Sequence, residues 1–268
     1  MKRRDCSNMR TLIKLGGTLL DEPQSRRRLA DEIAAFAAET GHQTVVVHGG
    51  GKQMTRFLAE RGIESTFVNG LRVTTPVVID AVLKIFAGSV NHELLSTFVA
   101  AGAKPVGLSG IDAALVEAVP LGGEYGAVGR PVRTNPELLD VLCAAGFLPV
   151  VACVAGDRAG NVYNVNADQM AVACAAGFRA EQLFFLTDVD GVRDASGQTA
   201  VCITTAQITD LIREGIATGG MQAKLEAAQK ALADGVRQVV IAPGAKPGIV
   251  AQLANNEVVG TRITGSVG

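Results

Sequence analysis

The chain has 268 residues, of which 48% are hydrophobic and only 4% are aromatic. This length can bury a substantial core, either as one large α/β domain or as two lobes that share a sheet. Its 25 basic and 26 acidic residues leave a net charge of −1 and Trp is absent, so neither a basic surface nor an aromatic platform for nucleic acid is indicated.

No membrane or export segment is indicated by the hydropathy of the sequence. The first ten residues, MKRRDCSNMR, are charged, but the apolar stretch of a signal peptide does not follow them. The longest apolar runs, such as 147–155, are too short to span a bilayer. We therefore expect a cytoplasmic protein with no membrane partner.

The five cysteines are dispersed along the chain without a CxxC pair. Four of them stand among Ala, Val, Leu and Ile, where a reduced thiol acts as a small apolar side chain. Packing is therefore the favoured interpretation, and metal ligation or catalysis is the alternative. These four are Cys143, Cys153, Cys174 and Cys202, and the fifth is Cys6.

Extended apolar runs alternate with segments of helical periodicity. In chain order, the expected strands are 12–15, 44–47, 147–154, 182–186 and 238–241. The expected helices include 29–36, 79–98, 135–145 and 221–233. Alternation of this kind predicts βαβ units and a mainly parallel sheet between helical layers.

Three segments carry more specific structural predictions. In the second helical segment, Ile79, Val82, Leu83 and Phe86 form one apolar stripe that should face the core. The glycine-rich segment LGGEYGAVG at 121–129 predicts a local hairpin. The two lobes should meet near residues 150–160.

Three glycine-rich turns follow expected strands. They are 14–17 (KLGG), 48–51 (HGGG) and 187–191 (TDVDG). Without Cβ atoms, such turns can aim backbone N–H groups at an anion, and ligands collect at the carboxyl ends of parallel strands. None matches a P-loop or a GxGxxG fingerprint, so each alone is equally a tight connection between a strand and a helix.

Two lysines are candidates for binding such an anion. Lys14 ends a buried apolar strand, so its ammonium group must reach a polar site. Lys224 lies in the first turn of an expected helix, where a cation is unfavourable unless an anion lies between it and the helix. A phosphate could satisfy both lysines; the alternative for Lys14 is a side chain that extends to the surface.

Eight ordered motifs lie between Leu12 and Ile263. They are KLGG (14–17), HGGG (48–51), NGLRVT (69–74), GLSG (107–110), NVNADQ (164–169), TDVDGV (187–192), GGMQAK (219–224) and GTRI (260–263). On these motifs the chain resembles the amino-acid kinase family. This resemblance implies an open αβα sandwich, with residues 1–155 as an acceptor-binding and dimerising lobe and 156–268 as an ATP-binding lobe.

The resemblance also implies roles for individual residues. Lys14 and Lys224 would stabilise the transferring phosphoryl group, and Asp168 would orient both lysines; the alternative for Asp168 is the N-cap of a helix that begins near Gln169. ATP and Mg²⁺ are the implied cofactors, with no metal ligand assigned among the residues. The implied acceptor-binding residues are Gly50, Gly51, Arg72 and Asn164, and the implied nucleotide-binding residues are Gly16, Gly17, Thr187, Asp188, Gly191, Gly219, Gly220 and Met221.

Within the family, NGLRVT and NVNADQ resemble the members that phosphorylate the side-chain carboxylate of N-acetyl-L-glutamate in arginine biosynthesis. A carrier-protein-linked aminoadipate or glutamate kinase of lysine biosynthesis is the alternative, and a non-catalytic ligand sensor is another. Uridylate, carbamate and aspartate kinases fit the two motifs poorly. A carboxylate acceptor is already ionised at neutral pH, so no base is needed, and we expect a structural role for His48.

The resemblance also suggests an assembly. Arginine-inhibited members have a longer N-terminal helix and a C-terminal loop from which residues 251–260 differ. We therefore expect a homodimer that arginine does not inhibit. The helical segment 79–86 is the candidate dimer surface, with packing on the sheet as the alternative.

Overall fold

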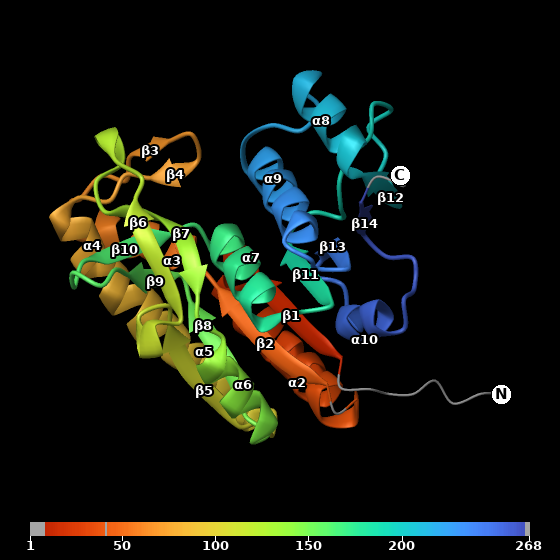
Figure 1. The fold of residues 1–268 in the computed structure, drawn as a ribbon, viewed down its shortest axis with the longest axis horizontal. Helices are drawn as coiled ribbons and strands as arrows, with labels where there is room; N and C mark the ends of the chain where they lie inside the picture. The colour runs from red at the N-terminus through yellow and green to blue at the C-terminus, as the bar shows by residue number, and fades with distance from the viewer. Residues whose placement is uncertain (1–8, 41, 266–268) are drawn as a thin grey trace.

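The computed structural model describes residues 9–40 and 42–265. Its centre is an eight-stranded sheet in the order β12-β14-β13-β11-β1-β2-β8-β5, in which only the β13–β14 pair is antiparallel (Figure 1). The expected α/β fold with a mainly parallel sheet is therefore confirmed. The strands are β1 (Arg10–Leu15), β2 (Gln43–His48), β5 (Pro105–Ser109), β8 (Leu148–Ala152), β11 (Gln182–Thr187), β12 (Cys202–Thr204), β13 (Gln238–Pro243) and β14 (Thr261–Thr264).

Helices cover both faces of this sheet (Figure 1). One layer contains α6 (Glu137–Ala144), α7 (Ala167–Phe178) and α9 (Gly219–Ala233), and the other contains α2 (Pro23–Thr40), α5 (Asn91–Ala100) and α10 (Ile249–Ala254). Because the central strands are covered on both faces, all six residues of β11 and the last five of β1 are buried. Their continuous apolar sequences are typical of such strands.

Smaller elements stand at the carboxyl end of the sheet. A four-stranded barrel contains β6 (Val116–Pro120), β7 (Val128–Thr134), β9 (Val154–Gly156) and β10 (Val162–Val165), and β3 (Phe67–Val68) pairs with β4 (Leu71–Arg72). The expected glycine-rich hairpin is confirmed, since β6 and β7 pair antiparallel on either side of η3 (Gly123–Tyr125). The remaining helices are α1 (Gly17–Asp21), α3 (Gly51–Ala59), α4 (Pro76–Val82), η1 (Leu83–Val90), η2 (Asp112–Ala114) and α8 (Thr205–Arg213).

The expected strand at 147–154 is wrong as a single element. The chain leaves the central sheet after Ala152, which is level with His48 and Ser109, and then enters the barrel as β9. Gly110 fixes this change of direction, because its N–H donates to Val154 O at 2.6 Å. An apolar run shows burial but does not show where a strand changes sheets.

The apolar stripe at 79–86 is also partly wrong. Val82 and Phe86 are buried, but Leu83 is 38% exposed. The buried face already passes through Val78 and Val82 in α4, one residue before the predicted stripe, and the chain then continues as a π-helix over Leu83–Val90. Ile85 and Val90 are buried instead.

The cysteines follow the packing interpretation with one exception. Cys143, Cys153 and Cys174 are buried, and burial raises the pKa of each thiol to about 12. Cys202 is exposed, because it begins the short edge strand β12. Cys6 lies outside the described residues. Within the described ranges, no helix is both long and apolar enough to cross a bilayer.

Candidate active site

The carboxyl ends of β11, β1 and β2 place the three glycine turns side by side. Leu15 at the end of β1 is level with His48 on β2 and with Leu186 on β11. The first two turns nearly touch, since a Cβ added to Gly17 would lie 3.5 Å from the backbone nitrogen of Gly51. The expectation that these turns share one edge of the sheet is confirmed.

At this edge, two lysines from distant parts of the chain meet one carboxylate. Lys14 Nζ at the end of β1 lies 2.7 Å from Asp168 Oδ1. Lys224 Nζ on α9 lies 2.8 Å from Asp168 Oδ2. All three side chains are largely buried. Two ammonium groups and one carboxylate give the cluster one net positive charge beneath the glycine turns.

The electrostatics of this cluster favour its charged form. Burial would raise the pKa of Asp168, but the nearby Lys14 and Lys224 ammonium groups bring it down to about 2. Burial lowers the pKa of Lys224, and the attraction of Asp168 opposes that change. The carboxylate is therefore ionised at every pH at which the protein would act, and it holds both lysines in place.

The N-cap alternative for Asp168 is wrong. Helix α7 begins at Ala167, and the side chain of Asn166 caps it by accepting from the N–H groups of Asp168 and Gln169 at 2.9 and 3.2 Å. The Asp168 carboxylate is therefore free to bind the lysines. Asn166 was missed from the sequence, although Asn is among the preferred N-cap residues.

Arg72 is a buried cation beside the second glycine turn. Its Nη2 donates to Gly51 O at 3.1 Å and to Thr55 Oγ1 at 2.9 Å, and its Nη1 donates to Ser65 Oγ. The guanidinium also stacks on Phe67, with Cζ 4.6 Å from the ring centre. Burial lowers the pKa of Arg72. Among the described residues it has no carboxylate partner, so an anionic ligand would compensate its charge.

The other two candidates for acceptor binding lie in the same region. Gly50 has no room for a side chain, because an added Cβ would lie 2.9 Å from the ring of Phe86. Asn164 on β10 is buried and donates from Nδ2 to Thr74 Oγ1 at 3.0 Å. Thr74 in turn donates to Arg72 O at 2.8 Å. Asn164 and Arg72 are thus parts of one hydrogen-bonded network.

The residues expected to hold a nucleotide lie at the ends of β11 and α9. Thr187 ends β11, and its hydroxyl donates to Asp188 Oδ1 at 3.2 Å. Burial opposes ionisation of Asp188, yet hydrogen bonds from its own N–H, Thr18 and Thr187, with Lys224 nearby, leave its pKa below the ordinary value. An added Cβ on Gly191 would lie 2.5 Å from Thr261 Oγ1, so close packing alone requires that glycine.

The first turn of α9 presents free backbone donors. Its N-cap Thr218 makes no side-chain capping bond, and Gly219 and Gly220 are exposed. The following helix places Lys224 in its second turn, one turn later than the sequence suggested. Uncapped N–H groups, the positive end of the helix dipole and an ammonium group together suit a phosphate.

His48 has a structural role at this edge. Its ring is fully buried, with Nδ1 2.8 Å from Gly49 O and Nε2 2.9 Å from Asn91 Nδ2. A carbonyl only accepts and an amide nitrogen only donates, so Nδ1 carries the proton and the ring is neutral. Burial, opposed in part by the bond to Gly49, lowers the pKa of His48 to about 4.

This histidine makes stability depend on pH. The unfolded chain takes up a proton on His48 near pH 6.5, whereas the folded protein does so only near pH 4. The free energy of unfolding should therefore fall as pH falls, by about 2 kcal/mol between pH 6.5 and about pH 5. Urea unfolding of wild type and His48→Asn over this range measures the effect. The exposed control His92→Asn should keep the wild-type slope; an equal slope in His48→Asn would contradict the assignment.

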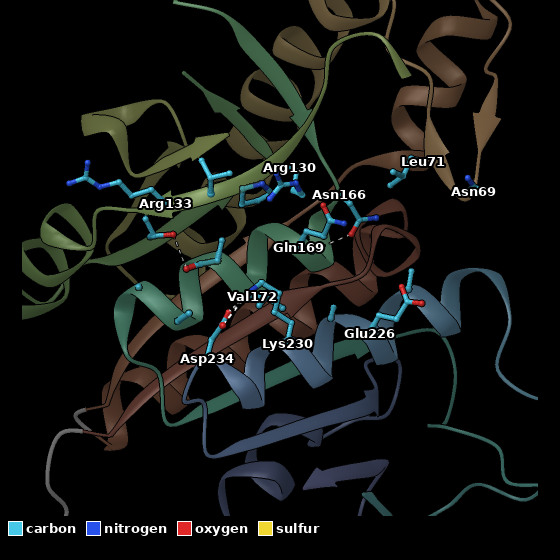
Figure 2. Close-up of a pocket in the computed structure, with 18 residues that line it drawn as sticks. Asn69, Leu71, Arg130, Arg133, Asn166, Gln169, Val172, Glu226, Lys230 and Asp234 are labelled. Carbon is cyan, nitrogen blue, oxygen red and sulfur yellow. Dashed lines mark hydrogen bonds and ion pairs between the residues drawn. The ribbon is translucent and has the colours of Figure 1, made fainter. Parts of the chain in front are cut away.

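A groove of about 620 Å³ runs past the site between β7 and the helices α7 and α9 (Figure 2). Asn166 and Gln169 border it at the start of α7, and Arg130 and Glu226 face it from β7 and α9. Lys230 in the last turn of α9 and Asp234 directly after this helix form an ion pair at 2.9 Å. The groove separates the barrel from the helix that carries Lys224.

Together, these features define an α/β protein with cations and glycine turns gathered at the carboxyl edge of its sheet, which is the charge pattern of a phosphoryl-transfer site. The Amino acid kinase family model matches residues 9–243. The chain belongs to the amino acid kinase family.

Two relatives extend this comparison over nearly the full length. An acetylglutamate kinase of Solibacter usitatus (strain Ellin6076) is 62% identical over 255 residues, which are 95% of this chain and 99% of that protein. An acetylglutamate kinase of Acidobacterium capsulatum is 39% identical over 264 residues, which are 96% of this chain and 100% of that protein.

Solved structures show the same fold. A Streptococcus mutans protein superposes with a TM-score of 0.81 at 28% identity, covering 95% of this chain and 98% of that one. N-acetylglutamate synthase from Neisseria gonorrhoeae, complexed with coenzyme A and N-acetyl-glutamate, has a TM-score of 0.86 at 24% identity. This match covers 97% of the present chain but 60% of the synthase, so it indicates a shared fold only.

Proposed function

We propose that this chain transfers the γ-phosphoryl group of ATP to the side-chain carboxylate of N-acetyl-L-glutamate. The products are ADP and N-acetyl-L-glutamyl 5-phosphate, and the reaction is a step of arginine biosynthesis. The observation that carries the proposal is the pair of buried lysines on one aspartate beneath the glycine turns. The full-length similarity to acetylglutamate kinases supports the choice of acceptor.

The acceptor binds, in this proposal, over residues 1–155 together with Asn164. Arg72 takes the α-carboxylate, because its planar fork can bind two oxygens at once. The backbone N–H groups of Gly50 and Gly51, at the start of α3, hold a further acceptor oxygen. The side-chain carboxylate then points toward Lys14.

The nucleotide binds over residues 156–268. The exposed N–H groups of Gly219 and Gly220 hold its phosphates at the start of α9, and Met221, whose own N–H donates to Thr218 O at 3.1 Å, lies beside them. Gly16 and Gly17 approach the phosphates from β1; Gly16 is tightly packed, since an added Cβ would lie 3.0 Å from Leu186 O. Thr187, Asp188 and Gly191 complete the contacts at the end of β11.

The reaction needs charge neutralisation and no proton transfer. An acceptor carboxylate oxygen forms the new bond to phosphorus as the bond to the β-phosphate oxygen breaks, and ADP leaves with the electron pair. Two unit charges 4 Å apart repel by about 4 kcal/mol at an effective dielectric near 20. Lys14 and Lys224 offset this repulsion in the transition state, and Asp168 keeps both in position.

Mg²⁺ fits the chemistry of this edge. Within the described ranges, no group of three or more His, Cys, Asp or Glu side chains could hold a metal, but Mg²⁺ bound to a nucleotide needs only one or two carboxylates beside the phosphates. Asp188 is the carboxylate that we assign to it, because it directly follows β11 at this edge of the sheet and lies near Lys224. The ion would neutralise charge on the β- and γ-phosphates.

A coupled assay for ADP release tests the proposal directly. ADP should be released with N-acetyl-L-glutamate, and far more slowly with L-glutamate or N-acetyl-L-aspartate. Hydroxylamine should trap the acyl phosphate as a hydroxamate. ATP binding without ADP release for any acidic acceptor would instead indicate a ligand sensor.

Replacing Arg72 with Lys should raise KM for N-acetyl-L-glutamate by roughly 10- to 100-fold and leave KM for ATP within about twofold. Lys keeps the charge but cannot make the paired, charge-assisted hydrogen bonds. Initial rates with each substrate varied in turn measure both constants. The control is Arg61→Lys, since Arg61 also stacks on a ring, that of Phe57, at 3.5 Å but is half-exposed. Equal increases in both KM values would contradict the role of Arg72.

We also propose a cytoplasmic homodimer for this chain. The helical segment α4–η1, which includes the half-exposed Leu83, is the surface that we assign to the contact. Arginine should leave the activity unchanged. Sedimentation of the purified protein and an arginine titration of the coupled assay measure these two properties.

A further inference from the structure

Thr74 joins two residues of the proposed acceptor site and is itself fully buried. Its hydroxyl donates to the backbone oxygen of Arg72 at 2.8 Å. The same hydroxyl lies 3.0 Å from Nδ2 of Asn164. The side chain of Thr74 faces the interior, and among the described residues its hydroxyl makes these two hydrogen bonds.

The hydrogen-bonding capacity of a hydroxyl decides how the Asn164 amide is turned. A hydroxyl has one proton, and Thr74 uses it on a carbonyl that can only accept. Toward Asn164, the hydroxyl can therefore only accept, so the NH₂ group of the amide must face it. The carbonyl oxygen Oδ1 of Asn164 then points away from Thr74, and no hydrogen bond from the described part of the chain reaches it.

The backbone around Thr74 holds this arrangement rigidly. The N–H of Thr74 donates to Tyr125 O at 2.9 Å, and its carbonyl accepts from Ala127 N at 2.7 Å. Ala127 O accepts in turn from Asn164 N at 2.9 Å. Gly126, at φ +64°, allows this close approach, because an added Cβ would lie 2.3 Å from Thr74 O. Thr74 and Asn164 are thus fixed to the same strand-like segment.

We propose that Thr74 is a positioning residue that makes Asn164 a hydrogen-bond acceptor, so that the site selects acceptors with an N–H group on the α-nitrogen. The inference rests on the proposed function. N-acetyl-L-glutamate has such an N–H in its acetamido group, and Asn164 Oδ1 accepts from it. A ligand without this N–H leaves a buried oxygen unpaired and binds more weakly.

The test compares two acceptors that differ in this one group. In O-acetyl-2-hydroxyglutarate, an ester oxygen replaces the N–H of N-acetyl-L-glutamate. The wild type should prefer the amide in kcat/KM by roughly 10- to 100-fold. In Thr74→Val, which keeps the shape but lacks the hydroxyl, the Asn164 amide is free to turn over, so this preference should fall by about tenfold. KM for ATP should stay unchanged.

The conservative variant Thr74→Ser retains the hydroxyl and should restore the preference for the amide. A merely structural role would change the melting temperature and the constants of both acceptors in parallel, and that result would overturn the inference. An amide-to-ester ratio in Thr74→Val equal to that of the wild type would overturn it as well.

A separate measurement distinguishes failure of this inference from failure of the proposed function. If the wild type transfers no phosphoryl group to N-acetyl-L-glutamate, the proposed function is wrong, and the orientation of Asn164 is judged by NMR. The side-chain NH₂ signal of Asn164, assigned by its loss in Asn164→Asp, should exchange slowly in the wild type and in Thr74→Ser and quickly in Thr74→Val. Equal exchange rates in wild type and Thr74→Val would overturn the inference.

Discussion

Replacing Lys14 with Ala should lower kcat roughly 100- to 1,000-fold and change both KM values by no more than a few-fold. The ammonium group of Lys14 lies 2.7 Å from the Asp168 carboxylate and is buried at the end of β1. No surface side chain can bring another positive charge to this buried position in the Lys14→Ala variant. The ammonium group of Lys14 attracts the transferring phosphoryl group most strongly in the transition state, where negative charge spreads over that group. Its removal should therefore lower kcat and leave substrate binding nearly unchanged.

Lys224→Ala should show the same pattern, because Asp168 holds both lysines. The double variant should lose less than the product of the two single losses, as residues that act as one unit do. The matched control is Lys230→Ala on the same helix, whose ammonium is exposed and paired with Asp234. Steady-state kinetics with each substrate varied provide the constants. A loss confined to KM would contradict the assigned transition-state role.

Replacing Asp168 with Asn should be the second large effect, with kcat falling at least about 100-fold. Both lysines would lose the carboxylate that holds them, and two buried ammonium groups would face each other without compensation. Breaking a buried ion pair by removing one partner costs about 3–5 kcal/mol. Urea unfolding at neutral pH should therefore show lower stability for this variant.

The residual activity of Asp168→Asn should also respond differently to pH. Burial lowers the pKa of Lys224, and the negative charge of Asp168 opposes that change. Removing this negative charge should lower the pKa of Lys224 further. The alkaline loss of kcat should then begin at a lower pH than in the wild type. Asp234→Asn, which removes the partner of the exposed Lys230, is the control and should keep the wild-type profile. An unshifted profile in Asp168→Asn would contradict the coupling.

The sequence predicted the layered fold well where burial repeats regularly. Runs such as 12–15 and 182–186 became central strands because residues covered on both faces must all be apolar. Prediction was poorer at the border of the buried face of a helix and at the edge of the sheet. Leu83 is exposed because the buried face of α4 passes through Val78 and Val82, and the thiol of Cys202 is exposed because it begins an edge strand.

The candidate site shows the same division. Lys14 and Lys224 could be singled out locally, since each is an ammonium group in a place that is unfavourable without an anion. Their shared partner could not, because Asp168 is 154 and 56 residues away from them in sequence and reaches both only through the packing of α7 on β1 and α9. The sequence also offered Asp168 a role as a helix cap, which Asn166 fills instead.

The sequence by itself therefore determined the α/β class, the three glycine turns and the presence of cations that need an anion. These properties depend on short-range chemistry: burial patterns, the absence of Cβ atoms and unpaired charge. Only the tertiary structure decided which groups face one another, namely the two lysines on Asp168 and the hydroxyl of Thr74 between Arg72 and Asn164. Hydrogen bonds act over about 3 Å, so the partners of these groups are set by packing and not by spacing along the chain.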